Sequence, residues 1–574
     1  MSPSLFIQPS VPMPPTKNPT GKTLNDLAET SCRNFGQRPA LSLAFHRPIS
    51  YGELFDRILR IASALKECGV RKKDRVAILA ENSPNWATAY LAAIRIGAVA
   101  VPILPDFPEA DVRHILKDAD VKILCTTQRQ IEKVYELRDH KISTTIMLDD
   151  SSLDMEFGHV ETFSGLLAHA DQLPEKYLQL AERPPDAGPD DLAAIIYTSG
   201  TSGHSKAVML SHGNLYANVS SANQLINITP DWTFLSILPM SHTYEFTIGF
   251  LLPLMNGARI VFAGKAPTPS TLQRICDKEK PSIICVVPMI MEKIYKKKVL
   301  GALEQNILLQ LAVMLPIVRR RILRKIGGRL LDFFGGELQL LAIGGAAINQ
   351  ETENFLKEAE FPYLVGYGLT EASPLLSGGP FKDSTIAVGS SGKPVPGVEI
   401  RISKPDPQTG IGEIMARGAN IMQGYAHHPE LTAQTIDRDG WLATGDLGCF
   451  DKLGNLHIKG RSKSVIVLSN GENIYPEAIE EKINAFVQVI ESLVRERDDR
   501  LEAHVYLDYD FIDQKTKNRS HQQKKEYIDQ LLKEIQQGVN AQLPSYAKLY
   551  QVLERTEPFI KTATHKIKRY LYIK

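Results

Sequence analysis

The stretch RVAILAENSPNWATAYLAAIRIGAVAVPIL (Arg75–Leu104) decides the fold class. It opens and closes on apolar runs of strand length, RVAIL and AVAVPIL. Between them, Ser83 is a typical N-cap, Pro84 fits the first turn of a helix, and Gly97 fits its end. A strand, a helix and a second strand in this order predict a βαβ unit, and therefore a parallel sheet.

The same alternation continues along most of the chain, which predicts a large α/β body with several sheets. Further apolar runs of strand length are VKILC, TTIMLD, TFLSIL, ARIVFA, SIICVV and LQLLAIGG. The pattern changes near KGRSKSVIVLSNGENIYPEAIE (Lys459–Glu480), where two short strand-like runs precede a helix. A long charged helix over about 515–540 and a basic tail follow, so we expect a small C-terminal α+β domain.

The composition is that of an ordinary globular protein, with 43% apolar and 23% charged residues among 574. The net charge of +1 gives no argument for nucleic acid as a partner. Six scattered cysteines without a CxxC pair argue against a zinc site or a disulfide framework and suit a reducing cytosol. The first twenty residues lack the pattern of a signal peptide, and no apolar run reaches 18 residues. We therefore expect a cytoplasmic protein.

A loop rich in glycine and hydroxyl groups, YTSGTSGHSKAV (Tyr197–Val208), follows the apolar run LAAIIY. The backbone N–H groups of such a loop can all point at one anion, and a lysine adds positive charge. The spacing of Gly200, Gly203 and Lys206 is not GxxxxGK[ST], which disfavours a Walker-type nucleotide hydrolase. The loop predicts a phosphate site; the alternative is a surface turn of small polar residues.

Four further motifs follow this loop in order: GYGLTE (Gly366–Glu371), TGDLG (Thr444–Gly448), KGRSK (Lys459–Lys463) and KTATHKIKR (Lys561–Arg569). Together the five motifs resemble the adenylate-forming superfamily, which includes acyl-CoA synthetases, firefly luciferase and the adenylation domains of peptide synthetases. The resemblance spans about 23–569. Within the superfamily, LPMSHTYEF (Leu238–Phe246), AIGGAAI (Ala342–Ile348) and GEIMARGANIMQGY (Gly412–Tyr425) resemble long-chain fatty acid–CoA ligases.

The resemblance implies a fold and a two-step reaction. An acid and ATP give acyl-AMP and pyrophosphate, and a thiol then displaces AMP, so the implied requirements are ATP, Mg²⁺ and coenzyme A. The implied domains are a flexible arm (1–22), a body that binds AMP and the acyl group (23–462), and a mobile C-terminal domain (463–574). Lys463 matches the hinge about which the small domain rotates between the two steps.

The first motif is expected to hold the β- and γ-phosphates. The residues concerned are Thr198, Ser199, Gly200, Thr201, Ser202, Gly203 and Lys206. The family loop usually reads TSGTTGxPKGV, so Ser202, Ser205 and Ala207 are departures that change the shape of the turn.

The next three motifs are expected to bind the rest of the nucleotide. Tyr367 matches the residue against the adenine, and Asp446 and Arg461 match those on the ribose, where a carboxylate can accept two hydroxyl hydrogen bonds. Thr370 matches the contact with the α-phosphate. Glu371 matches the Mg²⁺ ligand, because a hard cation prefers carboxylate oxygen. The alternatives are that Tyr367 is a core tyrosine, that Asp446 is an aspartate of a turn, and that Glu371 is a solvated glutamate.

Lys566 matches the adenylation lysine, which bridges the attacking carboxylate and the α-phosphate and stabilises the developing charge. Lys561 and Lys568 are neighbouring lysines without that match, and a solvated basic tail is the alternative. The SNGENI loop (Ser469–Ile474) is expected to serve thioester formation. The resemblance implies four catalytic residues: Lys566, Thr370, Glu371 and His242.

His242 matches a histidine beside the acyl site, and a structural histidine is the alternative. Phe246 stands where an aromatic ring can close the mouth of an acyl tunnel. Gly344, Gly345 and Ala346 are small residues that leave room for a chain, although they also suit close packing. The resemblance favours a medium- or long-chain fatty acid. No aspartate that matches the family residue for binding an amino group follows SHTYEF, which argues against an amino acid as the substrate.

The segment 308–336 combines apolar residues at helical spacing with six cations. Such a basic amphipathic helix predicts peripheral contact with the inner face of a membrane. The alternative is a helix packed on the body with a solvated basic edge.

Two other functions remain open. An acyl carrier protein ends in the same thiol as coenzyme A, so an acyl-carrier-protein synthetase or an acyl-AMP ligase fits the motifs equally. A non-catalytic lipid- or nucleotide-binding protein belongs to another class. The joint presence of Lys206, Glu371, Asp446, Arg461 and Lys566 argues against it, because a binding protein does not need all five.

Overall fold

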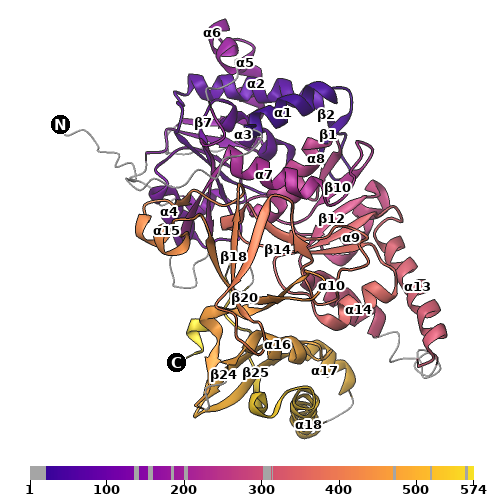
Figure 1. The fold of residues 1–574 in the computed structure, drawn as a ribbon. Helices are drawn as coiled ribbons and strands as arrows, with labels where there is room; N and C mark the ends of the chain where they lie inside the picture. The colour runs from indigo at the N-terminus through magenta and orange to yellow at the C-terminus, as the bar shows by residue number, and fades with distance from the viewer. Residues whose placement is uncertain are drawn as a thin grey trace.

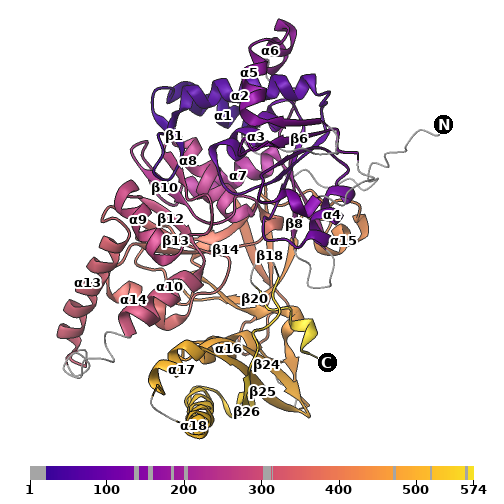
Figure 2. The same ribbon diagram turned by 180° about the vertical axis from the view of Figure 1, so that it is seen from behind.

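The computed structural model (Figure 1) contains a large body and a small C-terminal domain that lies against one end of it. Figure 2 shows the same two parts from behind. The structure describes residues 21–134, 141–152, 159–182, 187–198, 205–300, 312, 314–469, 473–517, 520–562 and 566–573.

The predicted βαβ unit lies in an eight-stranded sheet of the described residues, and it is confirmed. β3 (Arg75–Leu79) and β4 (Val99–Ile103) pair in parallel on either side of α3 (Pro84–Arg95) in sequence. Ser83 caps α3 by accepting a hydrogen bond from the Trp86 backbone N–H at 3.1 Å. The sheet order is β19 (Gly424–Tyr425), β9 (Lys206–Ser211), β8 (Leu192–Thr198), β4, β3, β5 (Val121–Thr126), β6 (Thr144–Met147) and β7 (His159–Thr162).

A second sheet of nine described strands is parallel from β1 to β14 and antiparallel at both edges. The apolar runs TFLSIL, ARIVFA, SIICVV and LQLLAIGG supply four of its strands. The order is β16 (Lys393–Pro394), β15 (Leu375–Gly378), β14 (Tyr363–Gly368), β13 (Leu340–Ile343), β12 (Ile283–Val286), β10 (Thr233–Ser236), β11 (Arg259–Phe262), β1 (Pro39–Leu43) and β2 (Ile49–Ser50).

A four-stranded antiparallel sheet completes the body and leads towards the C-terminal domain (Figure 1). Its order is β17 (Val398–Ser403), β18 (Gly412–Gly418), β20 (Leu442–Phe450) and β21 (Leu456–Arg461). The other helices of the body are α1 (Leu24–Asn34), α2 (Tyr51–Glu67), α4 (Glu109–Asp118), α5 (Phe163–Ala170), α6 (Glu175–Glu182), α7 (His212–Asn223), α8 (Leu252–Met255), α9 (Pro269–Glu279), α10 (Pro288–Ile294), α13 (Pro316–Phe333), α14 (Gln350–Glu358) and α15 (Pro429–Thr435).

The C-terminal domain is α+β, as predicted. Its elements are β22 (Ile466–Val467), β23 (Asn473–Ile474), α16 (Pro476–Asn484), β24 (Val489–Arg497), β25 (Arg500–Leu507), α17 (Tyr509–Lys515), α18 (His521–Asn540) and β26 (Leu549–Arg555). The single helix predicted over about 515–540 is wrong at its start. α18 begins at His521 because Ser520 and Gln523 form a capping box there.

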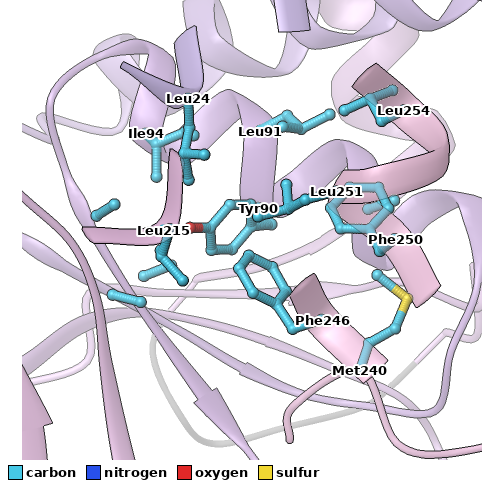
Figure 3. Close-up of a cluster of buried hydrophobic side chains, with 14 of the residues drawn as sticks. Leu24, Tyr90, Leu91, Ile94, Leu215, Met240, Phe246, Phe250, Leu251 and Leu254 are labelled. Carbon is cyan, nitrogen blue, oxygen red and sulfur yellow. The ribbon is translucent and has the colours of Figure 1, made fainter. Parts of the chain in front are cut away.

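Aromatic and aliphatic side chains from several helices fill the largest core (Figure 3). Phe246 is fully buried, and its ring centroid lies 4.7 Å from that of Tyr90 and 5.8 Å from that of Phe250. Leu254 lies at the edge of the same cluster with no exposed surface. Phe246 is therefore part of an aromatic cluster, and its role in closing the mouth of an acyl tunnel stays a prediction.

The described part of the basic helix predicted within 308–336 is α13, on the outer edge of the body (Figures 1 and 2); positions 308–311 and 313 lie outside the described residues. Its apolar side chains Leu323 and Leu330 are buried in a core of the body. Arg319 forms an ion pair with Glu358 at 2.6 Å, and Arg320 and Arg324 pair with Glu360. This packing agrees with the alternative of a helix docked on the body. Within the described residues, no helix is long and apolar enough to cross a membrane.

Leu254→Ala is expected to destabilise the body by about 2–5 kcal/mol, because it opens a cavity in the cluster of Figure 3. Leu453→Ala is the matched control: this side chain is 60% exposed, and its loss should change stability by less than about 0.5 kcal/mol. Urea unfolding monitored by circular dichroism measures both. Equal midpoints for the two variants would contradict the packing described here.

Candidate active site

Several of the predicted site residues follow the carboxyl ends of parallel strands in the nine-stranded sheet. His242 comes after β10, Gly344 to Ala346 come directly after β13, and Tyr367 lies at the end of β14. Ligands of open α/β sheets bind at this edge. Thr370 and Glu371 lie in the 3₁₀ turn that follows β14. The topology thus brings segments far apart in sequence to one edge.

Tyr367, Asp446 and Arg461 form one hydrogen-bonded group. Tyr367 donates its hydroxyl to Asp446 Oδ2 at 2.8 Å, and Arg461 Nε lies 2.9 Å from Oδ1. Asp446 and Arg461 face each other in the β20–β21 pairing. Burial raises the pKa of Asp446, and the Arg461 guanidinium opposes that shift. Each carboxylate oxygen keeps a further lone pair, so the group can still accept two hydroxyls of a ligand.

Glu371 and Lys206 meet through Tyr425. The Tyr425 hydroxyl donates to Glu371 Oε1 at 2.8 Å, and Lys206 Nζ lies 5.0 Å from the centre of the Tyr425 ring. Burial lowers the pKa of Lys206, as do the nearby cations Lys463 and Arg461, while Glu371 opposes the shift. Sequence reasoning missed Tyr425, although it ends the quoted motif GEIMARGANIMQGY.

The two ends of the predicted phosphate loop are adjacent. Thr198 ends β8 and Lys206 begins β9, and they are Cα partners in the antiparallel β8–β9 pairing. The residues predicted to cradle phosphates between them, Ser199, Gly200, Thr201, Ser202 and Gly203, lie outside the described residues. The described ends show that this loop connects two strands of the eight-stranded sheet beside Glu371.

Lys566 comes from the C-terminal domain. Its hairpin is closed by the Lys561–Ile567 bridge, and the Thr562 N–H donates to the Lys566 carbonyl at 2.8 Å. The side chain is exposed at the domain interface, yet the surrounding protein lowers its pKa, and the Arg461 guanidinium lowers it further. Asp446 and Glu371 oppose that shift. Lys566 therefore lies in the electrostatic field of the group formed by the body.

The predicted acyl residues come from the segments that follow β10 and β13. His242 is half-buried, and burial, with a smaller effect of Lys566, lowers its pKa to about 4. The next residue, Thr243, has its hydroxyl 3.4 Å from that of Thr370. The absence of a side chain at Gly344 lets the ring of Tyr244 approach the backbone closely, because a Cβ there would lie 3.1 Å from the Tyr244 ring carbon Cζ.

Gly345 and Ala346 are exposed, and Gly345 has a φ of +86°, a conformation that favours glycine. Phe246 points into the aromatic cluster of Tyr90 and Phe250. Lys463 is exposed in the short 3₁₀ turn Ser462–Ser464 between β21 and β22, where the chain passes from the body to the C-terminal domain.

Sequence reasoning also missed a buried carboxyl group, that of Glu245, three residues after His242. Glu245 is fully buried, and burial raises its pKa to about 8, a shift that the Ser236 hydroxyl opposes. A glutamate after a histidine in an apolar segment carries no sequence signal for burial. At neutral pH this carboxyl is therefore mostly protonated.

The fit of the site to Mg²⁺ rests on Glu371. Among the described residues, no group of three His, Cys, Asp or Glu side chains could hold a metal ion by itself. Mg²⁺ is commonly bound by one or two carboxylates together with substrate phosphates and water. The Glu371 carboxylate, close to Lys206 and the loop ends, is compatible with that mode.

Comparisons with known proteins agree with this arrangement. Residues 28–426 match the family described as AMP-binding enzyme. A ligase from Rhodococcus jostii RHA1 that joins CoA to a propanoyl group bearing a methyl-dioxo-octahydroindenyl ring system is 30% identical over 83% of this chain and 86% of its own. The long-chain-fatty-acid–CoA ligase heimdall of Drosophila melanogaster is 29% identical over 80% and 72%, respectively.

Among solved structures, ATP-bound MatB from Rhodopseudomonas palustris superimposes with a TM-score of 0.74, at 25% identity, over 96% of this chain and 98% of that one. The fold is the α/β adenylate-forming fold, with a large body of several sheets and a small C-terminal α+β domain. With the family match over more than half of its length, the chain belongs to the AMP-binding enzymes.

Proposed function

We propose that the protein is an ATP-dependent acid–CoA ligase that activates a medium- or long-chain fatty acid through acyl-AMP. The observation that carries this proposal is the hydrogen-bonded group of Tyr367, Asp446 and Arg461. Lys566 of the C-terminal domain lies within the electrostatic field of this group. The relatives support a CoA ligase, since two of them are named as such. Their acyl groups differ, so the fatty acid rests on the motifs around His242.

In the first half-reaction, a carboxylate oxygen of the acid attacks the α-phosphorus of ATP, and the bond to the bridging oxygen breaks to release pyrophosphate. We assign the ribose to Asp446 and Arg461, the adenine to the side of Tyr367, and the triphosphate to Thr198, Lys206 and the loop between them. Mg²⁺ held by Glu371 would neutralise charge on the phosphates. Thr370 would donate to the α-phosphate.

Lys566 would contact both reacting oxygens and stabilise the negative charge that develops between them. His242, held neutral by its low pKa, would contribute a hydrogen bond without adding charge near the substrate carboxylate. The neutral His242 on one side of the substrate carboxylate and the cation Lys566 on the other would orient the carboxylate towards the phosphorus.

In the second half-reaction, the thiol sulfur attacks the acyl carbonyl carbon, and AMP leaves with the carboxyl oxygen. We propose that the C-terminal domain turns about Lys463 between the steps and brings Ser469–Ile474 to the site; residues 470–472 of that loop lie outside the described part of the chain. A carrier protein in place of coenzyme A is the nearest alternative. A non-catalytic binding protein is the alternative of another class.

ATP–pyrophosphate exchange with acids from acetate to oleate tests the proposal. We expect exchange that depends on a medium- or long-chain acid and falls about 10²–10³-fold in Lys566→Ala. Lys568→Ala is the matched control and should keep the parent rate. Failure of all acids to support exchange would favour the binding-protein alternative, and equal losses in the two variants would remove Lys566 from its assigned role.

Coenzyme A and a phosphopantetheinylated carrier protein, added separately to isolated protein-bound acyl-AMP, test the acceptor. We expect coenzyme A to yield thioester and the carrier protein to yield none, as measured by mass spectrometry. The reverse result would assign the protein to the carrier-dependent alternative.

The pH dependence of exchange separates the two titrating groups. With a pKa of about 4, His242 should cause no change in rate between pH 6 and 8, although an ordinary histidine titrates near 6.5. Lys566 is active as the cation, so the rate should fall as pH rises through its pKa, which lies below the ordinary 10.5. A pH–rate profile of the parent and of Lys566→Ala measures both; a fall in rate as pH drops from 7 to 6 that persists in Lys566→Ala would contradict the assignment of His242.

A further inference from the structure

A lysine of the body closes the end of a helix in the C-terminal domain. Lys296 lies just after α10, in the π-helical segment Tyr295–Leu300. Its Nζ donates to the backbone carbonyls of Asn484 at 2.6 Å, Phe486 at 3.1 Å and Val489 at 3.2 Å. These carbonyls belong to the last residue of α16, to the turn after it and to the first residue of β24. The helix dipole at the end of α16 favours a cation there.

A second contact between the domains has the charges reversed: an anion of the C-terminal domain lies at the start of a helix of the body. Glu481 of α16 accepts a hydrogen bond from the Gln350 N–H, at the start of α14, at 3.1 Å. Asn349, which caps α14, donates its side-chain amide to the Glu481 carbonyl at 3.4 Å. An anion at a helix N-terminus is favourable for the same reason as a cation at a C-terminus. The body thus supplies a cation, Lys296, to the end of α16, and the C-terminal domain supplies an anion, Glu481, to the start of α14. The helices α10, α14 and α16 lie together in both views (Figures 1 and 2).

Lys296 also has acidic neighbours that keep it charged. Glu292, whose carboxylate accepts the Asn349 N–H at 2.9 Å, and the carboxylates of Asp508 and Glu351 all favour the ammonium form. Burial alone lowers the pKa of Lys296, so these groups offset part of the cost of keeping a cation at the interface.

From α16 the contacts continue to the hairpin that carries Lys566. Glu480 of α16 is buried and forms an ion pair with Arg569, and Glu477 Oε1 lies 3.6 Å from Arg569 Nε. Lys561, at the other side of the hairpin, pairs with Glu491. The hairpin therefore moves with α16, and the position of α16 on the body determines where Lys566 points.

We infer that Lys296 is a positioning residue for the first half-reaction, because its contact with the end of α16 holds the C-terminal domain in the orientation that presents Lys566 to Asp446. The inference rests on the proposed function, in which the domain leaves this orientation before the thiol attacks. The Lys296 contact must then break in each turnover. Its strength sets the equilibrium between the two orientations.

Lys296→Met removes the ammonium and keeps most of the side-chain volume. Two rates are measured in the intact protein: ATP–pyrophosphate exchange, and transfer of the acyl group from synthetic acyl-AMP to coenzyme A. Each rate is proportional to the fraction of molecules in its own orientation, so their ratio reports the equilibrium whichever orientation predominates. Loss of charge-assisted hydrogen bonds should lower the ratio of exchange to transfer by about ten- to a hundredfold.

Lys293→Met is the matched control, because Lys293 is exposed one turn earlier on α10, and it should keep the parent ratio. Glu481→Gln weakens the second contact and should lower the ratio in the same direction. A variant that is merely less stable loses both rates together and leaves their ratio unchanged. An unchanged ratio in Lys296→Met would overturn the inference.

Acetylation of the unliganded protein with acetic anhydride supplies a readout that needs no activity. Mass spectrometry should find Lys296 modified about tenfold or more slowly than Lys293, and Glu481→Gln should speed modification of Lys296 alone. Equal acetylation rates of Lys296 and Lys293 would contradict the contact between Lys296 and the end of α16. Protection of Lys296 in a protein that shows no exchange with any acid would remove the proposed function and leave the contact in place.

Discussion

The site depends on the carboxylate of Asp446, which is 6% exposed where β14 of one sheet meets β20 and β21 of another. A buried carboxylate is unfavourable unless hydrogen bonds and an opposite charge compensate for lost water. Tyr367 and Arg461 supply both, one from each sheet. Arg461 is also the last residue of β21 before the chain enters the turn that leads to the C-terminal domain. The Tyr367–Asp446 hydrogen bond thus joins two sheets, and the Asp446–Arg461 ion pair places the start of the linker.

The other charges around Asp446 are mainly cations that disfavour one another. Arg461 and Lys463 lower the pKa of Lys206, and Arg461 lowers that of Lys566. Such crowding is unfavourable in the free protein, and a polyanion such as a triphosphate would relieve it. Lys566 comes from the C-terminal domain, so the domain rotation that we propose would gather the cations for one step and disperse them for the next. This is the physical basis on which we propose a two-step ligase.

Much of the fold could be predicted because its signals are local. The strand, cap and helix pattern of Arg75–Leu104 predicted a parallel unit, which the β3–β4 pairing confirms. The motifs around Tyr367, Asp446 and Arg461 were predicted to serve one nucleotide, and the structure places these side chains in contact; their roles stay predictions. Helix ends were less certain, as the capping of α18 by Ser520 shows.

Contacts between distant segments could not be predicted. Tyr425 meets Glu371 because β19 pairs with β9, a pairing of two residues per strand that leaves little trace in the pattern. Phe246 turns into an aromatic cluster built from α3 and the π-helical segment Glu245–Leu251, which no spacing rule anticipates. Lys296 is one of several lysines in YKKK, and only the docking of α16 distinguishes it from its neighbours.

The central claim is that one acid and one nucleotide react where Lys566 meets the Asp446 group. A crystal structure with an acyl sulfamoyl adenosine, a stable mimic of acyl-AMP, tests it most directly. The account predicts ribose hydroxyls on Asp446, the adenine beside Tyr367, Lys566 Nζ within hydrogen-bond distance of the sulfamoyl oxygens, and the acyl chain leaving past His242. A mimic bound away from Asp446, or bound there with Lys566 distant and Lys296 still on α16, would contradict it.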